Sequence, residues 1–89
     1  MSKRETWPRW WYWDIEISAH ILRRMLDREF SEADLREMME DALDFHPDSV
    51  SGRWKISTRR RGEPWEIIVE PDGSRHCLVV VTAYMVEWK

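Results

Sequence analysis

One stretch of this chain, residues 14–34, constrains the fold more than any other because its pattern changes twice within a short length. Its first residues complete an alternation of apolar and polar side chains that predicts a half-buried strand over 11–17. Ser18 is a good helix N-cap, so the strand is expected to end there and a helix to begin. Ser31 and Asp34 form a shortened capping box that opens a second helix. Two consecutive helices need a surface to cover, and the remainder of the chain is expected to supply a sheet.

The rest of the chain supports this expectation with three further strand-like segments, separated by Pro- and Gly-containing turns. The predicted elements are an aromatic lead-in over 1–10, a strand over 11–17, helices over 18–28 and 31–45, and strands over 53–59, 64–70 and 75–84. This order, β-α-α-β-β-β, predicts an α+β fold with two N-terminal helices packed on an antiparallel sheet. With 89 residues, the chain is long enough for one domain, 1–89, with one small core.

Helical periodicity predicts which side chains of the two helices are buried. The buried stripe of the first helix is expected to contain Ala19, Ile21, Leu22, Met25 and Leu26. That of the second helix is expected to contain Leu35, Met38, Met39, Ala42 and Leu43. Two tryptophans before the first strand, Trp7 and Trp10, allow two interpretations: exposed rings that stack on bases or bind a partner, or rings that fold back over the core. The second is favoured in so small a domain.

Composition limits the setting in which the chain works. A single cysteine forms no internal disulfide, and no apolar run is long enough for a signal peptide or a membrane span. These features predict a cytoplasmic protein with no membrane partner. The net charge of −3 argues mildly against nucleic-acid binding. Acidic residues concentrate in 27–44 and basic residues in 53–61. This asymmetry can create one attractive face, but the favoured interpretation is that the two segments neutralise each other or are simply solvated.

Three residues of the first predicted helix stand in register on one face: His20, Arg24 and Arg28. A neutral histidine can accept a proton, and two guanidinium groups can clamp a phosphate and stabilise charge that develops on it. Surface helices carry such arginines routinely, so ordinary pairing of Arg24 and Arg28 with nearby carboxylates, with His20 capping local structure, is the alternative.

A second candidate cluster comes from the predicted sheet. It contains Arg53, Thr58 and Arg59 on one strand, with Thr82 and Tyr84 at the end of another. A terminal tyrosine can donate a hydrogen bond to a phosphate or stack on a base, although it can also simply close the core. The histidines and the cysteine lack metal-site spacing, and the chain has no glycine-rich phosphate loop. No metal and no cofactor is therefore expected.

A resemblance adds to these interpretations. Residues 18–35 resemble the opening of a widespread group of small bacterial domains, with a histidine, an Arg-Met pair, a second arginine, and then Ser/Thr-x-x-Asp. Residues 52–54, 65–72 and 78–84 resemble the rest of the same pattern. That group is similar to BrnT and RelE-type toxins, which belong to a ribonuclease superfamily with barnase-like and colicin-like members. The resemblance implies a β-α-α-β-β-β arrangement.

The resemblance also implies RNA cleavage without a metal, with an antitoxin as partner. Carried onto this chain, it assigns catalysis to His20, Arg24, Arg28 and Tyr84. Arg53, Arg59 and Thr82 are then expected to bind substrate, with Arg53 the looser match to the family and Arg59 assigned from the basic strand alone. His20 would act as the base on a ribose 2′-hydroxyl, or as the acid to the leaving oxygen. The acidic net charge departs from RelE-type toxins, which are usually basic.

Two functional hypotheses follow. The first is a metal-independent endoribonuclease of the RelE/BrnT kind, the toxin of a toxin–antitoxin pair, with RNA or the ribosome as target. The second is a non-catalytic module of the same fold that binds protein or RNA through Trp7, Trp10 and the basic strand 53–59. The register of His20 with its arginines favours the first, and the acidic charge favours the second. An exposed aromatic N-terminus and strands with side chains on both faces would also permit a homodimer.

Overall fold

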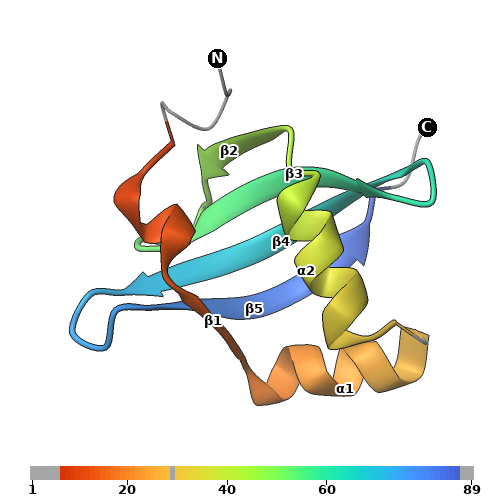
Figure 1. The fold of residues 1–89 in the computed structure, drawn as a ribbon, viewed down its shortest axis with the longest axis horizontal. Helices are drawn as coiled ribbons and strands as arrows, with labels where there is room; N and C mark the ends of the chain where they lie inside the picture. Colours follow the sequence, from red (N-terminus) through yellow and green to blue (C-terminus); the bar gives the residue numbers. More distant parts are fainter. Residues whose placement is uncertain (1–6, 29, 87–89) are drawn as a thin grey trace.

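The computed structural model describes residues 7–28 and 30–86 and shows an α+β domain (Figure 1). Within these residues, two α-helices accompany a five-stranded mixed sheet. In chain order the elements are the 3-10 helix η2 (Arg9–Tyr12), β1 (Asp14–Ile17), α1 (Ala19–Arg28), α2 (Glu32–Glu40), β2 (Asp44–Pro47), β3 (Trp54–Arg60), β4 (Glu63–Asp72) and β5 (Cys77–Met85).

The strand order of the sheet is β1-β5-β4-β3-β2. Strands β2 to β5 form an antiparallel meander, whereas β1 lies parallel to β5, with Ile15 opposite Leu78. The prediction of a purely antiparallel sheet is therefore wrong in this one pairing. Parallel neighbours need a long connection between them, and here both helices and three strands separate β1 from β5 along the chain.

The second helix is shorter than predicted, and a strand that sequence analysis missed follows it. Helix α2 ends at Glu40, and β2 pairs with β3 so that Phe45 lies opposite Ile56. Phe45 packs against Trp54, with 5.6 Å between ring centroids. Extended backbone places this ring in the core, whereas Leu43, expected in the helical stripe, is 41% exposed. Aromatic packing thus prevails over a helical pattern that continues past residue 40.

The predicted first strand is half replaced by η2. Amide groups of Trp11 and Trp13 donate to the carbonyl oxygens of Pro8 and Trp10, each at 3.1 Å, which winds this segment into one tight turn. Trp7 is only 9% exposed and lies 4.4 Å from Trp11 between ring centroids. Trp10 packs on Trp54 at 5.5 Å. The expectation that Trp7 and Trp10 fold back over the core is confirmed.

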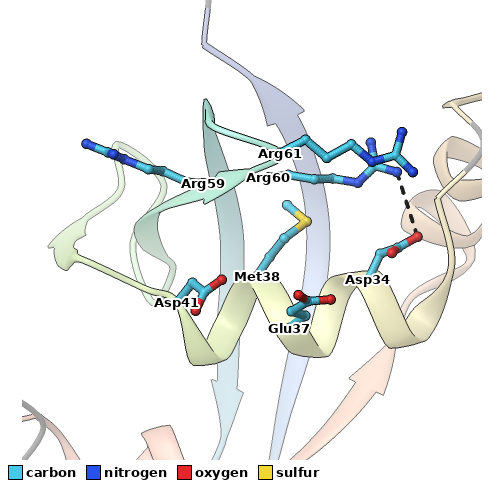
Figure 2. A pocket seen from close by; sticks show the side chains of 7 residues that line it. All are labelled: Asp34, Glu37, Met38, Asp41, Arg59, Arg60 and Arg61. Atoms are coloured by element: carbon cyan, nitrogen blue, oxygen red, sulfur yellow. Dashed lines mark ion pairs between the residues drawn. The ribbon is translucent and has the colours of Figure 1, made fainter.

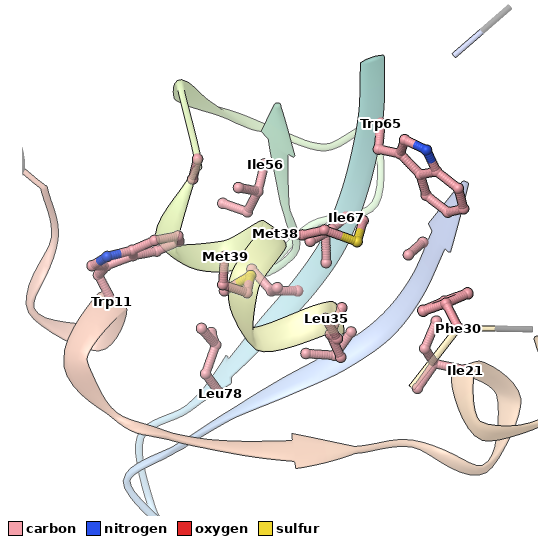
Figure 3. Close-up of a cluster of buried hydrophobic side chains, with 14 of the residues drawn as sticks. Trp11, Ile21, Phe30, Leu35, Met38, Met39, Ile56, Trp65, Ile67 and Leu78 are labelled. Carbon is pink, nitrogen blue, oxygen red and sulfur yellow. The ribbon is translucent and has the colours of Figure 1, made fainter. Parts of the chain in front are cut away.

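The core lies between the helices and one face of the sheet (Figure 3). Helix α2 crosses this face, and α1 runs along β5 (Figure 1). Because α1 flanks the sheet rather than covering it, only a narrow side of the helix, Ile21 and Met25, is buried. Leu22 and Leu26 are 54% and 77% exposed, and Ala19 is exposed, so their predicted burial is wrong.

Candidate functional site

The sheet has a second face that no helix of the described residues covers. It carries the side chains that alternate with the core residues along each strand. We call it the open face and define it by Arg53, Lys55, Ser57 and Arg59 at β3, Glu66, Ile68 and Glu70 on β4, and Val79, Thr82 and Tyr84 on β5. Four of the predicted site residues, Arg53, Arg59, Thr82 and Tyr84, therefore share one surface.

A β-bulge brings Thr82 and Tyr84 to this surface. Val69 pairs with Val80 but the preceding Ile68 pairs with Thr82, so Val81 is an extra residue in β5. Strict alternation from the buried Val80 would place Thr82 on the core face. The extra residue reverses the alternation beyond it, which is a known effect of bulges near functional sites. No pattern in the apolar run of β5 reveals this reversal.

Ser18 holds the bulged strand. Its hydroxyl donates to the Val81 carbonyl oxygen at 3.1 Å, and its amide donates to the Val80 carbonyl oxygen at 3.3 Å. The same hydroxyl accepts a hydrogen bond from the Ile21 amide at 3.2 Å. Ser18 is thus the N-cap predicted from sequence. It also ties the start of α1 to the strand that carries Thr82, a role that sequence analysis missed.

His20 and Arg24 stand one turn apart on α1, as their spacing predicts. His20 is exposed and Arg24 is partly buried. Arg28 is the last residue of α1, and its side chain lies outside the described part of the structure. Within the described part, no hydrogen bond or ion pair connects His20 or Arg24 to Thr82 or Tyr84. The two predicted clusters are therefore neighbours through Ser18 and β5, without a direct polar contact.

Tyr84 lies directly opposite Glu66 in the β4–β5 ladder. Partial burial and a hydrogen bond from its hydroxyl to the Glu66 carboxylate raise the pKa of Tyr84 to about 12. The phenol therefore stays protonated at neutral pH and acts as a hydrogen-bond donor. Local sequence signals do not pair Glu66 with Tyr84, because this pairing depends on the register of β4 and β5.

The basic residues of the open face differ in their surroundings. Arg53 Nε donates to Glu70 Oε1 at 3.3 Å, a cross-strand charge pair between the start of β3 and β4. Arg59 is exposed and Lys55 is partly buried, and neither makes an ion pair with another described residue. Thr58, grouped with them from sequence, instead points into the core, where its hydroxyl donates to the Met38 carbonyl oxygen.

Arg60 lies on the opposite side of β3, in a polar cleft beside α2 (Figure 2). The cleft has a volume of about 190 Å³ and is lined mainly by three arginines, 59–61, and three carboxylates of α2 and its end. Arg60 approaches Asp34 at 3.7 Å, and its guanidinium packs against the rings of Phe30 and Trp65, at 5.6 and 5.7 Å from their centroids. This contact supports the interpretation that the acidic helix and the basic strand neutralise each other. Because the opposed charges balance, the cleft is a weak candidate for a polyanion.

Residues 7–28 and 30–86 contain no cluster of three or more histidine, cysteine, aspartate or glutamate residues that could hold a metal ion. Within the same ranges, no helix is long and apolar enough to cross a membrane.

Fold and site together define a small α+β domain with an open, partly basic sheet face bordered by a histidine-bearing helix. The family model described as "Domain of unknown function (DUF4258)" matches residues 17–85, from the last residue of β1 to the last residue of β5. Since the match covers most of the chain, the protein belongs to the DUF4258 family. No curated protein and no solved structure matches the chain.

Proposed function

We propose that this protein is a metal-independent endoribonuclease of the RelE/BrnT kind, acting as the toxin of a toxin–antitoxin pair. The observation that carries the proposal is the bulge at Val81, which turns Thr82 and Tyr84 to the face that holds Arg53 and Arg59. The order of a strand, two helices and further antiparallel strands also supports it, although the resemblance implies three strands after the helices and the structure has four.

The open face offers what single-stranded RNA requires. Arg59 and Lys55 supply positive charge for phosphates, and Tyr84 supplies a ring and a protonated hydroxyl. Thr82, with a hydroxyl on the same face, positions the nucleotide. Binding of Arg53 to a phosphate would require its release from Glu70, a contact that is part-buried rather than enclosed and therefore inexpensive to break.

In the proposed reaction, His20 takes the proton of a ribose 2′-hydroxyl while Arg24 and Arg28 stabilise the charge that develops on the phosphate. The 2′ oxygen forms a bond to phosphorus, and the bond from phosphorus to the 5′ oxygen breaks. The leaving oxygen takes a proton from solvent, which gives a cyclic phosphate and a free 5′-hydroxyl. In the reverse assignment, His20 would instead donate the proton to the leaving oxygen.

The alternative function is a non-catalytic module that binds RNA or protein through the open face. The observation that favours it is that carboxylates already engage two members of the site: Glu70 pairs with Arg53, and Glu66 accepts from Tyr84. The form of this hypothesis that used Trp7 as an exposed ring is wrong, because Trp7 is buried. A module would therefore rely on the basic residues of β3.

The test is RNA cleavage in EDTA by the purified wild type and by His20→Ala, with folding checked by circular dichroism. His76→Asn is the matched control, since it removes another exposed imidazole and asparagine tolerates the positive φ of 50° at that position. We expect cleavage by the wild type and the control but not by folded His20→Ala. A folded wild type that cleaves neither free RNA nor RNA on translating ribosomes would refute the nuclease.

Binding separates the two functions if cleavage fails. A fluorescent RNA in which 2′-deoxyribose blocks the attacking hydroxyl reports affinity alone, by anisotropy. Binding that Arg59→Glu weakens, without any cleavage of normal RNA, would establish the module. Absence of binding as well as cleavage would exclude RNA for both hypotheses and leave a protein partner, such as an antitoxin, to be sought.

A further inference from the structure

A groove on the helix side of the sheet has a different chemistry from the open face. It lies between η2, the start of β1 and the end of α2, and it encloses about 360 Å³. This volume falls at the lower end of the range for small-molecule sites, roughly 300–1,000 Å³. Its walls include the consecutive aromatic residues Trp11, Tyr12 and Trp13, with Asp14 and Glu40 as its carboxylates. We call it the aromatic groove.

Ring contacts fix two of the three aromatic walls, Trp11 and Trp13. Trp11 packs on Trp7 in the core, and Trp13 stacks on His76 with 4.8 Å between centroids and 13° between ring planes. Tyr12 remains 67% exposed at the rim. Rings that are already fixed lose little conformational entropy when a ligand contacts them, so the groove is prepared for binding.

The charges of the groove select the ligand. Asp14 and Glu40 are exposed carboxylates, and the one basic lining residue, Arg36, pairs with Glu32 at 3.5 Å on the outer side of α2. Aromatic faces carry negative quadrupole charge and attract cations. Phosphate-bearing ligands would be repelled by both carboxylates. The groove therefore favours a positively charged group that is also apolar enough to enter an aromatic site.

We propose that the aromatic groove binds the alkylated ammonium group of a small free molecule. Such a group spreads its charge over methyl substituents and is weakly hydrated, so it loses little solvation on contact with indole and phenol rings. Sodium and potassium ions hold their water tightly and would not compete at physiological salt. The proposal is independent of RNA cleavage, because no residue of the open face lines this groove.

Calorimetry tests directly whether the ligand must be charged. It compares the binding of choline with that of the uncharged alcohol in which carbon replaces the choline nitrogen. We expect choline to bind and the isosteric alcohol to bind at least about five-fold more weakly, the factor that one cation–π contact supplies. Magnetic resonance then locates the site: the indole N–H signals of Trp11 and Trp13 should shift, while those of Trp54 and Trp65 stay in place. Equal binding of the two probes, or shifts at Trp54 and Trp65 alone, would overturn the proposal.

Variants separate the aromatic from the charge contribution. Tyr12→Ala should weaken choline binding about five-fold. The double variant Asp14→Asn with Glu40→Gln should weaken it as well. Glu63→Gln, which removes an exposed carboxylate from the distant β3–β4 turn, should leave it unchanged. Undiminished binding in the folded double variant, or equal loss in Glu63→Gln, would show that the carboxylates of the groove do not select the ligand.

Discussion

Replacing Ser18 by alanine tests the connection between α1 and the bulged strand. The change removes one oxygen that makes two hydrogen bonds, one from the Ile21 amide and one to the Val81 carbonyl. Loss of an N-cap costs about 1 kcal/mol, and loss of a further hydrogen bond costs a net of roughly 0.5–1.5 kcal/mol. We therefore expect Ser18→Ala to lower the free energy of unfolding by about 2 kcal/mol.

A matched control separates capping from the link to the sheet. Ser31 caps α2 in the same manner, accepting from the Asp34 amide at 3.2 Å, but its other contacts stay within the capping box. Ser31→Ala should therefore cost only about 1 kcal/mol. In a domain of this size each kcal/mol lowers Tm by about 4–8 °C, so the expected losses are about 8–16 °C for Ser18→Ala and half that for Ser31→Ala.

The assay is thermal and urea denaturation followed by circular dichroism, with wild type, both alanine variants and Ser18→Thr compared under identical conditions. Threonine restores the hydroxyl, so Ser18→Thr should recover most of the lost stability. If Ser18→Ala loses no more stability than Ser31→Ala, the bond to Val81 contributes nothing and the inferred link is refuted. Failure of threonine to recover stability would instead indicate that the hydroxyl is not the stabilising group.

Four further substitutions test other parts of the structure. Glu70→Gln releases Arg53 from its ion pair and should raise the affinity for a non-cleavable RNA about two- to five-fold, as measured by fluorescence anisotropy. Unchanged affinity would show that Arg53 does not bind the RNA. The pKa of Tyr84 is raised from 10.0 to about 12, so its contribution to the free energy of unfolding is complete below pH 10 and is lost as pH rises towards 12. Urea unfolding of Tyr84→Phe should therefore show no such loss of stability over this pH range. Ile21 is buried and Leu26 is exposed, so Ile21→Ala should lower the free energy of unfolding by roughly 2–4 kcal/mol and Leu26→Ala by less than about 0.5 kcal/mol. Similar losses for the two variants would contradict the placement of α1.

Local sequence signals located most of the secondary structure. The caps at Ser18 and Ser31 depend on residues within the next turn, so sequence alone predicted where both helices begin. Strands β3 and β4 followed from alternation and turn residues, and β5 followed from a continuous apolar run after a turn. The strand β2 did not, because residues 41–45 continue a helical apolar pattern. The rings that pack on Phe45 in the extended backbone belong to Trp7, Trp10 and Trp54, which are distant in the chain.

The candidate site was less predictable because its arrangement depends on contacts between residues far apart in the chain. The basic residues of β3 could be assigned to an outer face from alternation alone. The orientation of Thr82 and Tyr84 could not, since β5 is apolar on both faces and the position of its bulge is fixed by pairing with β4. Likewise, the burial of Leu22 and Leu26 was mispredicted because helical periodicity does not reveal that α1 flanks the sheet instead of covering it.

Ser18 links the two candidate clusters, the one on α1 and the one on the open face. Ser18 lies two residues before His20, and the Val81 carbonyl that it binds lies one residue before Thr82. Without the extra residue at Val81, Thr82 and Tyr84 would turn to the core face, and the carbonyl that accepts from Ser18 would lie in a different place. The register of one strand pair therefore controls both the composition of the open face and the position of the histidine-bearing helix. The proposed nuclease site would therefore depend on Ser18 and on the bulge as well as on His20.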